Sequence, residues 1–238
     1  EIYTLSLHDA LPICQVKKTL LREYRDETGL RRETIGLPLV LNFYELLPFW
    51  HTFFTSLGFG VVVSPPSNRN IYLKGQHSIP SDTACYPAKI AHGHIEELLD
   101  RKVDAIFYPC MSYNFDEGIS DNHYNCPVVA YYPEVVNSNM KRLRETRFIK
   151  DYVGIHRPKD FPKKIRAILE REFGPVPLRD VERAAKEAYA EERRYLTAIM
   201  DKGDEFLALA REKNLQAIVL SGRQPGRSEE RRVGKECR

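Results

Sequence analysis

Residues 37–63 read LPLVLNFYELLPFWHTFFTSLGFGVVV and carry a single charged side chain, that of Glu45. An apolar run of this length is long enough to span a membrane as a helix. Proline, glycine and polar residues interrupt the run at Pro38, Asn42, Glu45, Pro48, His51, Gly58 and Gly60. These interruptions favour several short buried elements of a globular domain over one membrane span.

The apolar run divides naturally into a strand, a helix and a second strand. We predict the first strand over residues 35–41, the helix over 44–57 and the second strand over 59–64. Gly58 suits the C-terminal end of a helix, and three consecutive valines at 61–63 are typical of a strand buried on both faces. The expected unit is βαβ.

The same alternation continues downstream. Residues 86–101 predict a helix, residues 103–109 a strand, and residues 126–133 contain a further strand before a helix that begins near Glu134. Strands that alternate with helices form a parallel sheet covered on both faces. We therefore expect an α/β fold with a Rossmann-like parallel sheet and flanking helices, which binds its ligands at the carboxyl ends of the strands.

Between Lys141 and Asn214 the sequence becomes rich in charge and helical in pattern. Residues 161–174 predict one amphipathic helix, and residues 177–213 predict a longer one. Glu192 and Gly203 interrupt the longer apolar stripe, so one kinked helix and two shorter helices both remain open. The basic residues fit a solvated helical face, with attraction to the phosphates of CoA as the alternative.

The two ends of the chain resemble translated sequencing adapter. One oligonucleotide read on opposite strands can encode both ALPI at 10–13 and RSEER at 227–231. We therefore interpret residues 1–14 and 227–238 as adapter-derived and set them aside, as one does for tags. Four parts lie between: a linker or helix arriving from upstream (15–34), a cysteine-bearing α/β domain (35–150), a helical segment (151–214) and the first strand, LQAIVLSGR, of a truncated second α/β unit (215–226).

The overall composition excludes several classes of protein. Lysine and arginine number 36 against 33 acidic residues, which gives a net charge of +3. This near-balance gives no reason to expect a nucleic acid or a membrane surface as partner. Five cysteines are too few for a disulfide-rich secreted scaffold, and two of them, Cys14 and Cys237, belong to the ends that we set aside.

The three remaining cysteines are Cys85, Cys110 and Cys126, each close to a proline. The predicted topology brings all three to one edge of the sheet, where three thiolates could hold a metal ion or an iron–sulfur cluster. The residues alone leave other interpretations open. The cysteines could be inert core residues, they could bind structural zinc with His123 or His92 as fourth ligand, or one could be a nucleophile.

Five motifs carry a resemblance to a known family. They are the run at 37–63 with the following serine, IPSDTACYPAKIAHGHI, IFYPC, DNHYNCPVVAYYPEV and IVLSGR. Together they resemble the acyl-CoA dehydratase activase-related proteins, which belong with the 2-hydroxyacyl-CoA dehydratase and benzoyl-CoA reductase superfamily. The resemblance covers about residues 33–223, and this branch of the superfamily is largely a domain of unknown function.

The resemblance implies iron–sulfur chemistry. In the characterised relatives three cysteines hold a [4Fe-4S] cluster, and the matching positions here are Cys85, Cys110 and Cys126. It further implies a cytoplasmic protein of anaerobic metabolism that works in low-potential electron transfer, or in dehydration or reduction of an acyl-CoA. The implied partners are an ATP-dependent activase domain fused upstream and the missing C-terminal half, which could complete a double-cubane centre. The intact parent would be dehydratase-like or reductase-like, with this fragment inactive alone.

Polar residues near the cysteines are candidates for supporting roles, and we assign no catalytic residue. His92, His94, His123, Asn122 and Asn125 could hydrogen bond to the cluster or deliver protons, or they could simply cap the 120–126 loop and cover a helix.

Asn42 and Glu45 follow the first predicted strand, where α/β sheets bind ligands, and could face a substrate or cap a helix. The competing hypothesis for the whole domain is a non-catalytic partner or scaffold of an ATP-dependent activase, with no cluster or with structural zinc.

Overall fold

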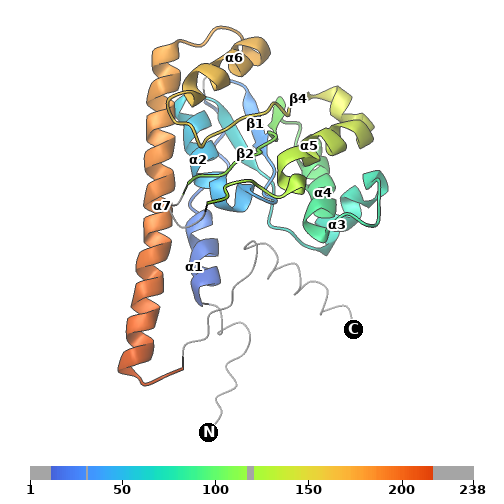
Figure 1. The fold of residues 1–238 in the computed structure, drawn as a ribbon. Helices are drawn as coiled ribbons and strands as arrows, with labels where there is room; N and C mark the ends of the chain where they lie inside the picture. Colours follow the sequence, from blue (N-terminus) through green and yellow to red (C-terminus); the bar gives the residue numbers. More distant parts are fainter. Residues whose placement is uncertain (1–11, 31, 117–120, 217–238) are drawn as a thin grey trace.

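The computed structural model describes residues 12–30, 32–116 and 121–216 (Figure 1). The helices are α1 (Pro12–Leu21), α2 (Phe43–Ser56), α3 (Arg69–Gly75), α4 (Tyr86–Asp100), α5 (Pro127–Asn139), α6 (Phe161–Phe173) and α7 (Leu178–Glu212). The strands are β1 (Thr34–Leu37), β2 (Gly60–Val63), β3 (Ala105–Phe107) and β4 (Arg147–Ile149), and two 3-10 turns are η1 (Gln76–Ser78) and η2 (Lys141–Glu145). No helix in these ranges is long and apolar enough to cross a membrane.

The four strands form one parallel sheet in the order β2-β1-β3-β4. Ile35 pairs with Val61 on one side and with Ala105 on the other, and Ile106 pairs with Phe148 of the edge strand. Helices cover the sheet, with α2 and α7 on one side and α4 and α5 on the other (Figure 1). The predicted α/β fold with a parallel sheet is confirmed, and all four strands end at the same edge.

The strand, helix and strand predicted from the apolar run are confirmed, with shorter strands. β1 ends at Leu37 because Pro38 has no N–H to continue the ladder, and Leu41 turns the chain into α2 with a positive φ of 52°. The buried face of α2 is aromatic: the ring of Trp50 lies 4.7 Å from that of Phe107 in β3, and the ring of Phe53 lies 5.4 Å from that of Phe161 in α6.

The prediction of a strand within 126–133 is wrong, because these residues begin α5. Pro127 occupies the first turn of this helix, where proline is well tolerated. Val129, Tyr132 and Val136 are buried at helical spacing, so the β-branched content that suggested a strand serves a helix face instead. The fourth strand of the sheet is β4, which lies in the charge-rich part where we predicted no strand.

One further helix was not predicted, and another settles a choice that the sequence left open. α3 lies between the first βαβ unit and α4, in a stretch for which we made no prediction. α7 is one helix of 35 residues, which settles the choice between one helix and two. It packs along α2 and passes beside α1 (Figure 1). Of the segments interpreted as adapter, residues 1–11 and 227–238 lie outside the described residues, whereas residues 12–14 belong to α1. Residues 217–223 of the predicted strand also lie outside the described residues.

Candidate functional site

The three cysteines lie at the carboxyl edge of the sheet. Cys110 lies three residues after the end of β3 and is buried, while Cys85 and Cys126 are the residues that precede α4 and α5. Each of these helices leads into a parallel strand, so its N-terminus lies at the carboxyl edge. None of the three is in a disulfide. The prediction that the topology brings them to one edge is confirmed.

Hydrogen bonds join the loop of Cys126 to the loop of Cys110. Asn125, the residue before Cys126, donates from its side chain to the Met111 carbonyl at 2.9 Å and from its backbone to the Ser112 carbonyl at 2.9 Å. Cys126 therefore lies beside the segment that follows Cys110.

Tyr108 is a buried residue two positions before Cys110, and our sequence analysis missed it. Its side chain is 1% exposed, and its hydroxyl has no hydrogen-bond partner among the described residues. Burial raises its pKa, and the charges of Tyr132, Cys110 and Cys85 raise it further. A buried hydroxyl without a partner is costly, so it marks a place where a polar ligand atom would be stabilised. Its position one residue before Pro109-Cys110 is the only signal in the sequence.

The Cys110 thiol is held in its neutral form. Burial raises its pKa to about 11, and the Glu134 carboxylate acts in the same direction. Hydrogen bonds from the Glu134 backbone and from Tyr152 oppose this rise, as does the Lys150 ammonium, which pairs with Glu134 at 2.7 Å. A neutral thiol is a poor nucleophile, so the geometry does not favour Cys110 as a catalytic nucleophile.

We tested whether this neighbourhood fits an iron–sulfur cluster. The donor set is suitable in kind, with three free thiols at one edge and the unpartnered Tyr108 hydroxyl near two of them. Within the described residues, however, no three Cys, His, Asp or Glu side chains form a group that could hold a metal ion. The three thiols therefore share one edge of the sheet without forming a group that could hold a metal ion.

His92 and His94 lie in the core and have structural partners. His92 bonds to the Ser78 hydroxyl at 2.8 Å and to the Tyr132 hydroxyl at 3.1 Å, and His94 bonds to the hydroxyls of Ser64 and Ser67. Burial lowers the pKa of His92 to about 4 and that of His94 to about 3. Both rings are neutral at pH 7 and both nitrogens of each are hydrogen-bonded, so zinc ligation by either nitrogen of His92 would require breaking one of its hydrogen bonds.

The residues of the 120–126 loop mainly support the loop itself. The side chain of Asn122 accepts a hydrogen bond from the Tyr124 backbone at 3.0 Å, as a loop cap does. His123 Nε2 lies 3.5 Å from a carboxylate oxygen of Asp116. Asn125, described above, fastens the loop to Met111 and Ser112.

Asn42 and Glu45 point to different parts of the molecule. Asn42 is buried and donates to the Met111 sulfur at 3.0 Å, so it adjoins the Cys110 loop. It makes no capping hydrogen bond to α2. The Glu45 carboxylate instead raises the pKa of Glu192 in α7, which places it toward the α2–α7 interface.

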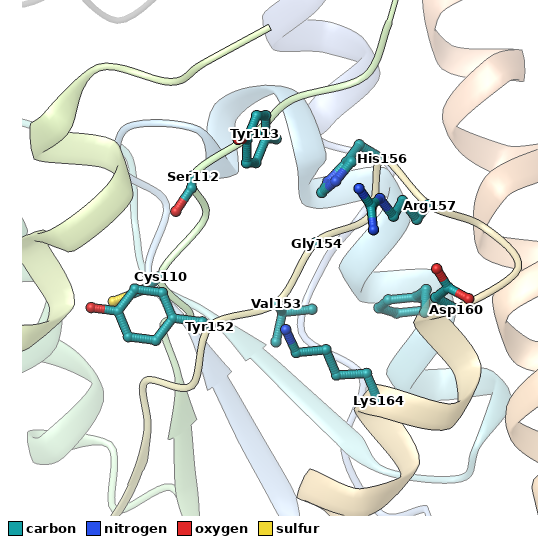
Figure 2. A pocket seen from close by; sticks show the side chains of 11 residues that line it. Cys110, Ser112, Tyr113, Tyr152, Val153, Gly154, His156, Arg157, Asp160 and Lys164 are labelled. Carbon is teal, nitrogen blue, oxygen red and sulfur yellow. The ribbon is translucent and has the colours of Figure 1, made fainter.

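A pocket of about 360 Å³ opens next to Cys110 (Figure 2). Its lining comes from the loop after β3, from residues 152–157 after β4 and from the start of α6. The side chains that face it include His156, Arg157 and Lys164, none of which we identified from the sequence. The only signal was indirect: they follow a strand too short and too charged to be recognised as one.

Fold and site together define an α/β domain with a parallel sheet and a cysteine-bearing carboxyl edge. The family described as the CoA enzyme activase uncharacterised domain matches residues 34–225, and the chain belongs to this family. The match begins at the first residue of β1 and includes every candidate residue named above. The resemblance to acyl-CoA dehydratase activase-related proteins is thus confirmed at the level of the family. No curated protein and no solved structure matches the chain.

Proposed function

We propose that this domain binds a [4Fe-4S]-type cluster through Cys85, Cys110 and Cys126 and serves an ATP-dependent activase system that acts on CoA thioesters. The observation that carries the proposal is the placement of three free cysteines, from three separate loops, at the carboxyl edge of one sheet. When bound, such a cluster supplies low-potential electron transfer or a Lewis-acidic iron for dehydration or reduction. The activase partner and the acyl-CoA substrate are part of the same proposal.

The protein residues would hold and shield this group. Cys110 sits on a buried strand end, and its backbone is tied to the segment after β4 by hydrogen bonds at 3.1 Å to Asp151 and 3.0 Å from Val153. This donor is therefore fixed. Cys85 and Cys126 are the residues that immediately precede α4 and α5. The Tyr108 hydroxyl has a free hydrogen to donate to a sulfur atom.

Anaerobic reconstitution of the full chain with iron and sulfide tests the proposal. We expect absorbance at about 400 nm and about four iron and four sulfide ions per chain. Replacing Cys85, Cys110 or Cys126 by serine should reduce the retained iron by at least about tenfold, because even the loss of a residue behind a metal ligand weakens binding that much. Iron, sulfide and zinc analysis of each variant provides the measurement.

The chain offers matched controls for this experiment. Cys14→Ser and Cys237→Ser remove the two other cysteines and should leave the iron content unchanged, as should His123→Ala. A colourless protein that carries one zinc ion per chain would instead establish the competing function, a non-catalytic partner domain of an activase. Equal iron loss from the control variants would also overturn the proposal.

Tyr108→Phe provides an independent check on the position of the bound group. In the cluster-free protein, loss of an unpartnered buried hydroxyl should raise the free energy of unfolding by about 1 kcal/mol. In the reconstituted protein this gain should disappear, because the hydroxyl then has a partner. Urea unfolding of both forms, each with and without the substitution, measures the difference. A gain of equal size in both forms would place the cluster away from Tyr108.

A further inference from the structure

The pocket beside Cys110 has an electrostatic character that the proposed cluster does not explain. Three residues of charged type lie on its rim, Arg157, Lys164 and Asp160 (Figure 2). Nearby cations are paired: Lys150 with Glu134 and Arg171 with Asp151. By contrast, no ion pair within 4 Å joins Arg157 or Lys164 to an acidic group in the described part of the chain. The rim therefore carries a net charge of about +1 and two cations available to a ligand.

His156 adds an unused polar atom to the same pocket. Its Nδ1 is buried and has no hydrogen-bond partner among the described residues. The ring packs against Tyr113 with centroids 4.9 Å apart. Burial lowers the pKa of His156, and the charges of Arg157 and Lys164 lower it further, so the imidazole is neutral at pH 7. A buried ring nitrogen without a partner is costly unless a ligand atom reaches it.

Gly154 makes this position of the His156 ring possible. A Cβ atom at residue 154 would lie 2.6 Å from Cε1 and 2.8 Å from Nδ1 of the ring. Such separations are well below van der Waals contact, so any larger residue would displace the imidazole from the pocket. The lack of a side chain at Gly154 therefore leaves the space that the His156 ring occupies.

We propose that this pocket binds a small organic acid with one negative charge, with its carboxylate between Arg157 and Lys164 and a polar atom at His156 Nδ1. Its volume of about 360 Å³ lies in the lower part of the range for small-molecule sites. The half-buried Tyr113 offers apolar surface for the body of the ligand. Asp160 opposes a second negative charge, which disfavours phosphate and polyphosphate groups. The proposal does not depend on the cluster and is tested on the cluster-free chain.

Titration of the histidine-labelled protein with benzoate, propanoate and inorganic phosphate, followed by NMR, tests the proposal. We expect the His156 imidazole signals to shift saturably with the two carboxylates at concentrations up to about 10 mM, and phosphate to bind at least about tenfold more weakly. Arg157→Gln and Lys164→Gln should each weaken carboxylate binding by about tenfold, because each removes a charge-assisted hydrogen bond.

Lys163→Gln is the matched control, because Lys163 is an exposed lysine in the same turn of α6 that does not line the pocket. It should leave the affinity unchanged, whereas Gly154→Ala should weaken binding by displacing the His156 ring. Three results would overturn the proposal: no saturable shift, tighter binding of phosphate than of benzoate, or equal weakening by Lys163→Gln and Lys164→Gln. All substituted charged residues are exposed, so these variants are expected to fold.

Discussion

Replacing Gly93 by alanine is expected to lower the free energy of unfolding by at least about 3 kcal/mol, the upper part of the range for overpacked sites. α3 and α4 cross at Gly75 and Gly93 with their backbones in contact. A Cβ atom at residue 93 would lie 1.7 Å from the carbonyl oxygen of Ile71 and 2.6 Å from its carbon. These are backbone atoms, so no side chain can rotate away, and the two helices must separate.

Gly203→Ala is the matched control for this experiment. Gly203 lies inside α7, and a Cβ atom there would meet no atom within 4 Å. Alanine should therefore stabilise the protein by about 1 kcal/mol through helix propensity alone. Urea unfolding followed by circular dichroism compares the two variants with the parent. A Gly93→Ala protein as stable as the parent would show that α3 does not pack on α4 as described.

The second large effect concerns Glu192, whose carboxyl group is buried in α7 against α2. Burial raises its pKa to about 8, and the carboxylates of Glu45 and Glu191 raise it further, while a hydrogen bond from the Phe49 backbone lowers it. One of its oxygens has no partner among the described residues. We expect Glu192→Gln to raise the free energy of unfolding by about 2 kcal/mol or more at pH 8. At pH 4.5 the substitution should change this free energy little.

The direction follows from proton binding. In the unfolded chain Glu192 ionises near its ordinary pKa of 4.5, whereas in the folded protein it keeps its proton up to about pH 8. Between these values the folded state binds more protons, so its stability falls by about 1.4 kcal/mol per pH unit as the pH rises, and it levels off above pH 8.

Urea unfolding at pH 5, 6.5 and 8 measures the difference between the two proteins. Glu182→Gln, an exposed position in the same helix, is the control and should follow the parent at every pH. A parent protein whose stability stays constant across this window would contradict the assignment of a buried, protonated Glu192.

Much of the fold follows from the sequence because the buried residues of β1, α2 and β2 form one apolar run that proline and glycine divide. The prediction failed at residues 126–133 and at β4 because neither stretch has a hydrophobic pattern that is specific to one structure. Residues 127–136 are β-branched and apolar, which suits a buried strand and a buried helix face equally, and only Pro127 favoured the helix. β4 is a three-residue edge strand in which only Ile149 is buried, so its hydrophobic pattern is too short to recognise.

The candidate site, too, could be predicted from the sequence only in part. Cys85 and Cys110 could be placed at one edge because the predicted helix and strand beside them are correct and topology fixes the ends of parallel strands. Cys126 lies at the same edge for another reason, because it precedes α5, where we predicted a strand. Tyr108 and His156 could not be found, because what distinguishes them is the lack of a partner for a buried polar atom, and that depends on every neighbour in space. His92 and His94 were named for their closeness in sequence to Cys85, yet α4 directs both into the core.

The graded burial of the three thiols sets how this protein would respond to air. Cys85 is exposed, Cys126 is half-buried and Cys110 is buried. Oxidation of a thiol to sulfenic acid depends on its exposure, so Cys85 should react first while Cys110 stays intact. Damage by oxygen would then be confined to one residue at the start of α4, with the fold untouched. At that first stage a thiol reductant would reverse it.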